Sequence, residues 1–311
     1  MQHDGPPKAA RVTEDSFAAL VRAFMLSSKF AAYAEETRKL WGRELMFAAR
    51  PDCLGTLSLQ EIRPSLVQAF FDGLAGRPGK QAASLAAIKQ LEKYAVVRDL
   101  LPRPITTGVE IEDSDGGHVP WSGEQVELAE RHARPDIALA ITLGANTGQR
   151  GSDLVRMGWT DIEIFKGIEG IAVRQVKTGR EVWVPILSAL AAAMATWQRR
   201  PGPFLLRQDG RPWTRVALTN AWLHERRVNP ALAPLRTADL VMHGLRGHAC
   251  VRLVRAGLNT RQISDIVGMS EPMVARYTRL SLQRENAIAA VHHLERTILE
   301  RKTDAAKKSG S

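Results

Sequence analysis

The chain has 311 residues, and its 43 lysines and arginines outnumber its 33 aspartates and glutamates, which gives a formal charge of +10 at pH 7. This charge favours a polyanionic partner, with nucleic acid as the first candidate and a solvated basic surface as the alternative. Two widely separated cysteines, Cys53 and Cys250, argue against a disulfide framework or a zinc cluster, and no apolar run is long enough to span a membrane. Because the polar N-terminus also lacks a secretory pattern, we expect a cytoplasmic protein.

The first third of the chain predicts four helices and no strand. Apolar residues recur at helical spacing in residues 16–25, 31–49, 64–74 and 79–97. Tyr33, Leu40 and Trp41 are expected to face inward from the second helix. Residues 58–61 have the pattern of a capping box, and Pro64 suits the first turn of the third helix.

A break in this pattern marks a domain boundary. Pro102-Arg103-Pro104 is followed by the polar, turn-rich residues 113–117. We therefore expect a helical domain over residues 1–105, a linker over 106–120 and a second domain over 121–311.

The second domain is expected to be mostly helical with one small antiparallel sheet. Helices are predicted at about residues 122–134, 135–144, 187–197, 214–227, 243–255, 260–267, 272–280 and 284–301. Ser152 is expected to cap a short turn. Residues 162–165, 171–176 and 181–186 have the alternation and flanking turns of three short strands.

Two isolated cations of this domain lie where the backbone could fix them. Thr147 and Gly148 permit a tight turn before Arg150, and a positioned arginine stabilises the charge of a phosphoryl-transfer transition state. Asp153 could hold this arginine, or could be an acid favoured by a helix N-terminus. Lys177 lies between two predicted strands, where its ammonium could protonate a leaving oxygen. The alternatives are a surface arginine and an ordinary turn lysine.

A histidine and an arginine share one face of a predicted helix further along. His243 could act on a nucleophile's proton or bind a phosphate oxygen, with Arg246 beside it. The alternative is a capping histidine with an exposed arginine, and His248 lies off this face. Tyr277 follows with the spacing of a core tyrosine. A role as nucleophile instead requires its hydroxyl to face a cationic pocket that lowers its pKa.

These segments, in this order, resemble the conserved boxes of the tyrosine recombinase, or phage integrase, family. Residues 147–154 are similar to its first arginine box, 176–179 to its hairpin-lysine box, 243–246 to its second box and 277–279 to its nucleophile segment. The resemblance covers about residues 121–291. It implies a two-domain, C-shaped clamp that is mainly α, with the first domain a SAM-like, core-binding DNA-binding domain and the second the catalytic domain.

The resemblance also implies an activity, namely site-specific recombination that cleaves and rejoins duplex DNA without a metal or another cofactor. Arg150 and Arg246 would hold the scissile phosphate, and His243 would assist proton transfer. Lys177 would protonate the leaving 5′ oxygen, and Tyr277 would form a 3′-phosphotyrosine.

The expected partners follow from the same resemblance. They are double-stranded DNA, a homotetramer on two paired sites in which the tail after the tyrosine docks on a neighbouring subunit, and an accessory DNA-bending or directionality factor. We therefore expect a nucleoid-associated enzyme of a mobile element that drives DNA integration.

One departure from the family concerns a hydrogen-bond donor. Met269 follows Gly268 where the family usually has histidine or tryptophan, and the interval to Tyr277 is one residue shorter than usual. A thioether cannot donate a hydrogen bond to a phosphate oxygen. Either cleavage is slowed, or another donor such as Arg276 or His248 replaces the missing one.

Three other functions remain compatible with the sequence. A non-catalytic DNA-binding relative is the first, and the methionine favours it. A type IB topoisomerase would share the chemistry. A helix-turn-helix regulator is suggested by the short helices at residues 260–280.

Overall fold

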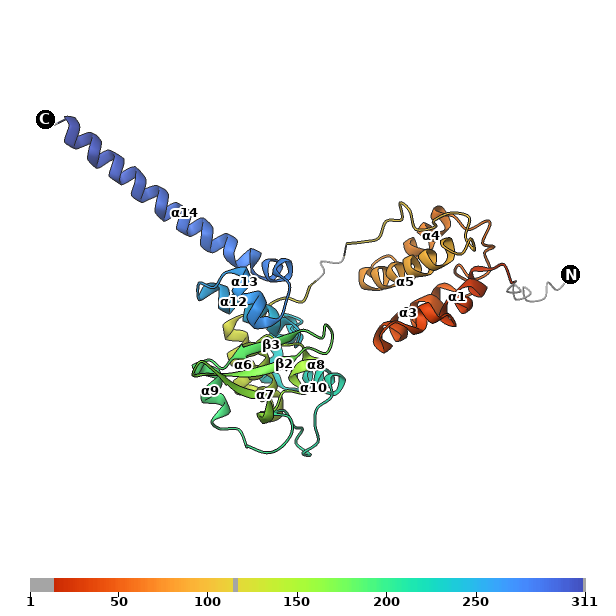
Figure 1. Cartoon of the computed structure of the whole chain (residues 1–311). Coiled ribbons are helices and arrows are strands. Elements are labelled where there is room, and N and C mark those ends of the chain that lie inside the picture. The colour runs from red at the N-terminus through yellow and green to blue at the C-terminus, as the bar shows by residue number, and fades with distance from the viewer. Residues whose placement is uncertain (1–13, 114–116, 310–311) are drawn as a thin grey trace. The chain divides into compact units, whose positions relative to one another are not determined.

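The protein divides into two compact units, Met1–Gly116 and Gly117–Ser311. The computed structural model describes residues 14–113 and 117–309. Both units are mostly helical, and the second also contains the three strands (Figure 1). The expected fold class, mainly α with a small antiparallel sheet in the C-terminal part, is confirmed. No helix within the described ranges is both long and apolar enough to cross a membrane.

The first unit contains the four expected helices and one short helix, α2, that was not predicted. Its helices are α1 (Phe17–Met25), α2 (Ser28–Ala31), α3 (Glu35–Ala48), α4 (Pro64–Asp72) and α5 (Pro78–Val96). The predicted helix over residues 31–49 was wrong at its start, because the chain leaves helical geometry between α2 and α3. Leu40 is exposed rather than inward-facing. The expected capping box at residues 58–61 is absent, since Arg63 occupies the N-cap of α4 and Ser58 bonds to Asp15 instead.

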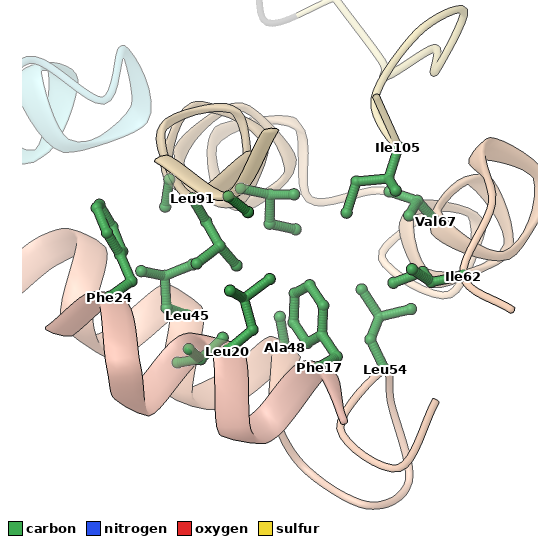
Figure 2. Close-up of a cluster of buried hydrophobic side chains, with 14 of the residues drawn as sticks. Phe17, Leu20, Phe24, Leu45, Ala48, Leu54, Ile62, Val67, Leu91 and Ile105 are labelled. Carbon is green, nitrogen blue, oxygen red and sulfur yellow. The ribbon is translucent and has the colours of Figure 1, made fainter. Parts of the chain in front are cut away.

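Apolar side chains from all five of these helices form a single core in the first unit. Figure 2 shows Phe17, Leu20 and Phe24 of α1 pointing toward Leu45 of α3 and Leu91 of α5. These side chains are at least nine-tenths buried. The core gives the unit its own source of stability, because burying apolar side chains is the main favourable term in folding.

Part of the expected linker packs against this core. Ile105 is buried in it, and Val109 and Ile111 pack on its edge. The Glu92 carboxylate accepts hydrogen bonds from the backbone N–H groups of Ile105 and Thr106, both at 2.6 Å. The chain is therefore tied to the first unit beyond residue 105.

The second unit is built from helices placed before and after the sheet. They are α6 (Gly123–His132), α7 (Pro135–Thr147), α8 (Gly151–Leu154), α9 (Ser188–Met194), α10 (Arg215–Val228), α11 (Ala233–Thr237), α12 (Gly244–Arg255), α13 (Thr260–Val267) and α14 (Glu271–Ser309). The capping box of α6 is present, with Ser122 and Gln125 bonded reciprocally. The sequence did not predict α11.

The sheet has the order β1-β2-β3 with both pairs antiparallel, from β1 (Ile162–Phe165), β2 (Ile168–Arg174) and β3 (Glu181–Pro185). Ile171 pairs with both Ile162 and Val184 across the sheet. The buried face carries Ile171 and Val184 into a core shared with α7, α9 and α10. The sheet thus holds the turn after β2 in a fixed position over the end of α7.

The last helix is longer than the pattern of apolar residues predicted. Two helices were expected with a break near residues 281–283, but α14 runs without interruption from Glu271 to Ser309 and extends beyond the other elements of its unit (Figure 1). Residues 281–283 contain neither proline nor glycine, so the chain has no backbone reason to leave the helix there.

Candidate active site

Arg150 is fixed by the backbone turn that the sequence predicted. Gly148 ends α7 with a φ of 63°, a left-handed conformation that favours glycine. A Cβ at this position would lie 2.9 Å from Ala249 Cβ and from Val267 Cγ1, so the close packing also requires glycine. Arg150, not Ser152, occupies the N-cap of α8. The expectation of a serine cap was therefore wrong.

A buried glutamine, and not Asp153, holds the Arg150 side chain. Arg150 Nη1 donates a hydrogen bond to Gln175 Oε1 at 2.8 Å. Gln175 Nε2 in turn donates to Gln149 Oε1 at 2.9 Å and to Val267 O at 3.1 Å. Both glutamines are almost fully buried. These bonds join the turn between α7 and α8, the turn after β2 and the end of α13, so a network across three segments holds the guanidinium.

The turn that carries Lys177 is tied to the same network. Asp153 is buried, and its Oδ1 accepts a hydrogen bond from the backbone N–H of Val176 at 2.8 Å. Thr178 Oγ1 donates to Gln175 Oε1 at 3.0 Å. Lys177 itself is exposed. The aspartate therefore orients the lysine turn rather than the arginine beside it.

Arg246 is the most deeply buried cation of the group. It lies in the first turn of α12 and is 2% exposed. Its Nη1 donates to Gly148 O at the end of α7 at 2.6 Å, whereas its buried Nη2 has no hydrogen-bond partner among the described residues. Burial, and next the nearby Arg150 charge, lower the pKa of Arg246 to about 10. It remains charged at neutral pH, with one nitrogen free for an anion.

His243 stands beside these cations in a neutral form. It occupies the N-cap position of α12 but makes no capping hydrogen bond, so the alternative of a capping histidine is wrong. Partial burial, then repulsion from His118, Arg246, Arg150 and Lys177, lower the pKa of His243 to about 4. The ring is therefore free to accept a proton at neutral pH.

Tyr277 lies in the second turn of α14 with its ring packed in an apolar cluster. The ring is 9% exposed and lies among Cys250, Val274 and other apolar side chains. It also packs against the start of α12, since a Cβ on Gly247 would lie 2.8 Å from Tyr277 Cδ1. Burial raises the pKa of Tyr277, although the charges of Arg246, Arg276 and Arg150 act in the opposite direction. The expectation of a lowered pKa was therefore wrong, and the hydroxyl is protonated at neutral pH.

The departure at Met269 has a structural counterpart. Its side chain is 5% exposed and belongs to the same apolar cluster as Tyr277. The two substitutes considered from the sequence have other contacts: His248 Nδ1 lies 2.9 Å from Trp121 O, and the guanidinium of Arg276 lies against Gly117.

All five residues singled out from the sequence lie in one region of the second unit. The charges of Arg150, Lys177 and Arg246 act on His243, and those of Arg150 and Arg246 act on Tyr277. Gln175 was missed, because a glutamine after a strand has no distinctive pattern. His118 was missed because it lies in a segment interpreted as linker. Its ring centroid is 4.8 Å from that of His243.

This arrangement can bind a phosphate group and move protons near it. Two guanidinium groups provide charged hydrogen-bond donors, a neutral imidazole can accept a proton, and an exposed ammonium can donate one. Among residues 14–113 and 117–309, no group of three or more His, Cys, Asp or Glu side chains has the arrangement of a metal site.

Known proteins resemble the chain in both sequence and fold. The family model described as the phage integrase family matches residues 126–284. A lambda integrase dimer bound to a COC′ core site is 17% identical, with a TM-score of 0.66, and the match covers 88% of this chain and 81% of that chain. A Tn1549 transposon integrase in complex with circular intermediate DNA is 16% identical, with a TM-score of 0.66, and the match covers 84% of this chain and 94% of that chain.

A lambda integrase tetramer bound to a Holliday junction is also similar, at 16% identity and a TM-score of 0.64, with 87% of this chain and 83% of that chain covered. At these identities the likeness concerns the fold. No curated protein sequence matches the chain.

Proposed function

Because the chain belongs to the phage integrase family, we propose that it is a tyrosine-type site-specific recombinase that cuts and rejoins duplex DNA. Tyr277 is the nucleophile, and Arg150, Lys177, His243 and Arg246 complete the active site. The substrate is double-stranded DNA of the nucleoid and of a mobile element that the enzyme integrates. The first unit provides DNA contacts as the core-binding domain.

The observation that carries this proposal is the buried Nη2 of Arg246, which has no hydrogen-bond acceptor in the described structure. A guanidinium nitrogen that is buried without an acceptor costs free energy, roughly 1–3 kcal/mol or more for a charged group. Its Nη2 has no partner within the described structure, and the charge of Arg150 lies close enough to lower its pKa. A phosphate oxygen supplies the missing acceptor and neutralises both cations at once.

The reaction balances in atoms and protons. The Tyr277 oxygen forms a bond to the scissile phosphorus, its proton passes to the neutral His243 ring, and the bond from phosphorus to the 5′ oxygen breaks. Lys177 gives a proton to that leaving oxygen. The products are a 3′-phosphotyrosyl enzyme and a free 5′-hydroxyl end. Attack by the 5′ hydroxyl of another strand reverses these steps, and the linkage keeps the energy of the original bond.

The protonation states of Tyr277 and His243 are compatible with these proposed steps. The raised pKa of Tyr277 means that its proton must be removed during attack, and the lowered pKa of His243 keeps that ring unprotonated at neutral pH, so that it has a free nitrogen to accept the proton. The two arginines stabilise the additional charge of the transition state, which makes them more important for cleavage than for binding.

An apolar stripe on the last helix supports assembly into a tetramer. Ile288, Val291, Leu294 and Ile298 are each more than half exposed and lie within one face of α14. Contiguous exposed apolar residues indicate a protein contact. The proposed occupant is a neighbouring subunit on the paired DNA site.

Leu294→Glu is expected to leave single-site binding intact and to abolish the tetramer in sedimentation of the DNA complex.

A suicide substrate tests the covalent step. The Tyr277→Phe variant first selects a preferred duplex from a randomised pool, and that duplex is then synthesised with a nick beside each candidate cleavage position. The parent protein is expected to yield a covalent adduct on denaturing gels, and Tyr277→Phe none. Selection of a duplex without any adduct would support the non-catalytic relative instead. Relaxation of supercoiled plasmid without any selected sequence would support a topoisomerase.

A further inference from the structure

The segment just before α6 is pressed against the start of α12. Gly244 has no room for a side chain, because a Cβ there would lie 2.7 Å from Trp121 Cδ1 and would also meet the carbonyl oxygen of Val119. A Cβ on Gly247 would lie 2.8 Å from Pro120 Cγ. The segment 117–121 therefore packs directly on the backbone of α12, the helix that carries Arg246.

Hydrogen bonds and ring packing anchor the end of this segment. Trp121 is 2% exposed, its Nε1 donates to Val241 O at 2.9 Å, and its ring packs on Trp222 at 5.1 Å between centroids. Its carbonyl oxygen lies 2.9 Å from His248 Nδ1. The residues just before Trp121 consequently have a fixed path over the active site.

This path brings a second imidazole next to His243. The rings of His118 and His243 lie edge to face, with centroids 4.8 Å apart and an interplanar angle of 65°. Both residues are exposed. An imidazole N–H is the kind of donor that Met269, buried in its apolar cluster, cannot supply.

We propose that His118 is a catalytic residue, whose ring donates a hydrogen bond to a non-bridging oxygen of the scissile phosphate beside His243. The inference rests on the recombinase function proposed above. In this proposal, the segment before α6 supplies the hydrogen-bond donor that Met269 cannot provide. The donors to the phosphate therefore come from two separate parts of the chain.

Substitution of His118 separates cleavage from binding. With the selected nicked duplex at saturating protein, His118→Ala is expected to slow adduct formation by about 10²-fold, the cost of removing one transition-state donor. His118→Gln, which keeps a donor group, is expected to recover part of that rate. Affinity for the uncut duplex is expected to change by less than about threefold, because most of it comes from other phosphate contacts. The matched control is His132→Ala, which removes an exposed histidine from α6.

A modified substrate distinguishes contact with the phosphate from a structural role. In a methylphosphonate duplex, one non-bridging oxygen at the cleavage site is replaced by a methyl group that accepts no hydrogen bond. For the stereoisomer that lacks the contacted oxygen, parent and His118→Ala are expected to react at the same rate. An undiminished effect of the substitution on both stereoisomers would show that His118 acts only through the fold, which overturns the proposal.

A spectroscopic readout does not depend on activity. In the Tyr277→Phe variant, the ring nitrogen signals of His118 are expected to shift when the selected duplex binds, and an unchanged signal contradicts the proposed contact. The outcomes are distinguishable from failure of the recombinase function. A parent protein that forms no adduct refutes both, whereas a parent adduct with an unaffected His118→Ala rate refutes only the role of His118.

Discussion

The two sides of α12 hold their functional groups in different ways. On one side, Arg246 bonds to the end of α7, and Arg150 is held by Gln175 within a buried hydrogen-bond network. On the other side, Tyr277 lies in an apolar cluster, and its ring fits against a glycine. Hydrogen bonds are directional whereas apolar packing is not, so the cations have one defined geometry and the tyrosine is positioned by shape alone.

This difference matches the role that the proposed function gives to each group. Groups that stabilise a transition state are effective when they are oriented before the substrate arrives. A nucleophile must move toward phosphorus and away again, and a packed ring can move without breaking a hydrogen bond. Substitutions near Arg150 and Arg246 should therefore slow cleavage by misplacing the guanidinium groups. Substitutions near Tyr277 should slow it by changing how the ring packs.

The largest effect is expected from Arg246→Lys. An ammonium cannot both donate to Gly148 O and present a second nitrogen to the phosphate in the same plane. Single-turnover cleavage should fall by about 10²–10³-fold, as for loss of a transition-state donor. Arg252→Lys is the matched control, since Arg252 lies on the same helix but bonds to Asn146. Equal losses in both variants would contradict the assignment.

A smaller loss is expected from Gln175→Leu, which removes the acceptor of Arg150 and the donor to Gln149. Misplacing a catalytic group by an ångström costs about 10²-fold in rate. The buried oxygen left on Gln149 should also cost about 1–3 kcal/mol in the free energy of unfolding, measured by urea titration. Gln208→Leu, at an exposed glutamine of the same unit, should change neither quantity.

On the tyrosine side, Gly247→Ala should act through packing. The added methyl would lie 2.8 Å from both Tyr277 Cδ1 and Pro120 Cγ, so both contacts must be relieved. Overpacking typically costs about 1–3 kcal/mol, and a cost of about 1.4 kcal/mol in tyrosine placement slows cleavage about tenfold. Gly123→Ala serves as control, because a Cβ there meets nothing within 4 Å. Normal cleavage by Gly247→Ala would mean that this contact does not position the nucleophile.

The smallest effect concerns pH and His243. The pKa of its ring falls from an ordinary 6.5 to about 4 on folding, so the unfolded state binds more protons between these values. The protein should therefore lose stability as pH falls from about 6.5 toward 4, and His243→Asn should lose less over that interval. Urea midpoints at about pH 7 and about pH 5 measure this, with the similarly lowered pKa of His248 present in both proteins. An identical pH dependence would contradict the shift.

Helices and strands with strong local signals could be predicted from the sequence. The three strands have alternating apolar residues and glycine turns, and Ser122 with Gln125 forms the expected capping box. The errors had two different causes. Leu40 fits a helical stripe but lies outside the core, and the continuity of α14 depends on the absence of a helix breaker rather than on its apolar pattern.

The candidate site was predictable only where residue type and spacing carry information. Arg150, Arg246 and Tyr277 stand in recognisable segments and lie near one another in the structure. Gln175 and His118 lie beside partners that are 25 or more residues away along the chain, so no local pattern reveals them. The direction of the pKa shift of Tyr277 also required the structure, since it depends on how burial balances against the cations.

The uninterrupted course of α14 has a mechanical consequence. Roughly 48 Å of helix follow Tyr277 before Ser309, at about 1.5 Å per residue. The start of this helix is held by the packing of Val274 and Tyr277 on α12 and α13, while the rest of it extends away from the unit. A force applied at its far end reaches the phenol as a rotation. In the proposed recombinase, a contact made far along α14 would therefore move Tyr277 while the arginines stay where they are.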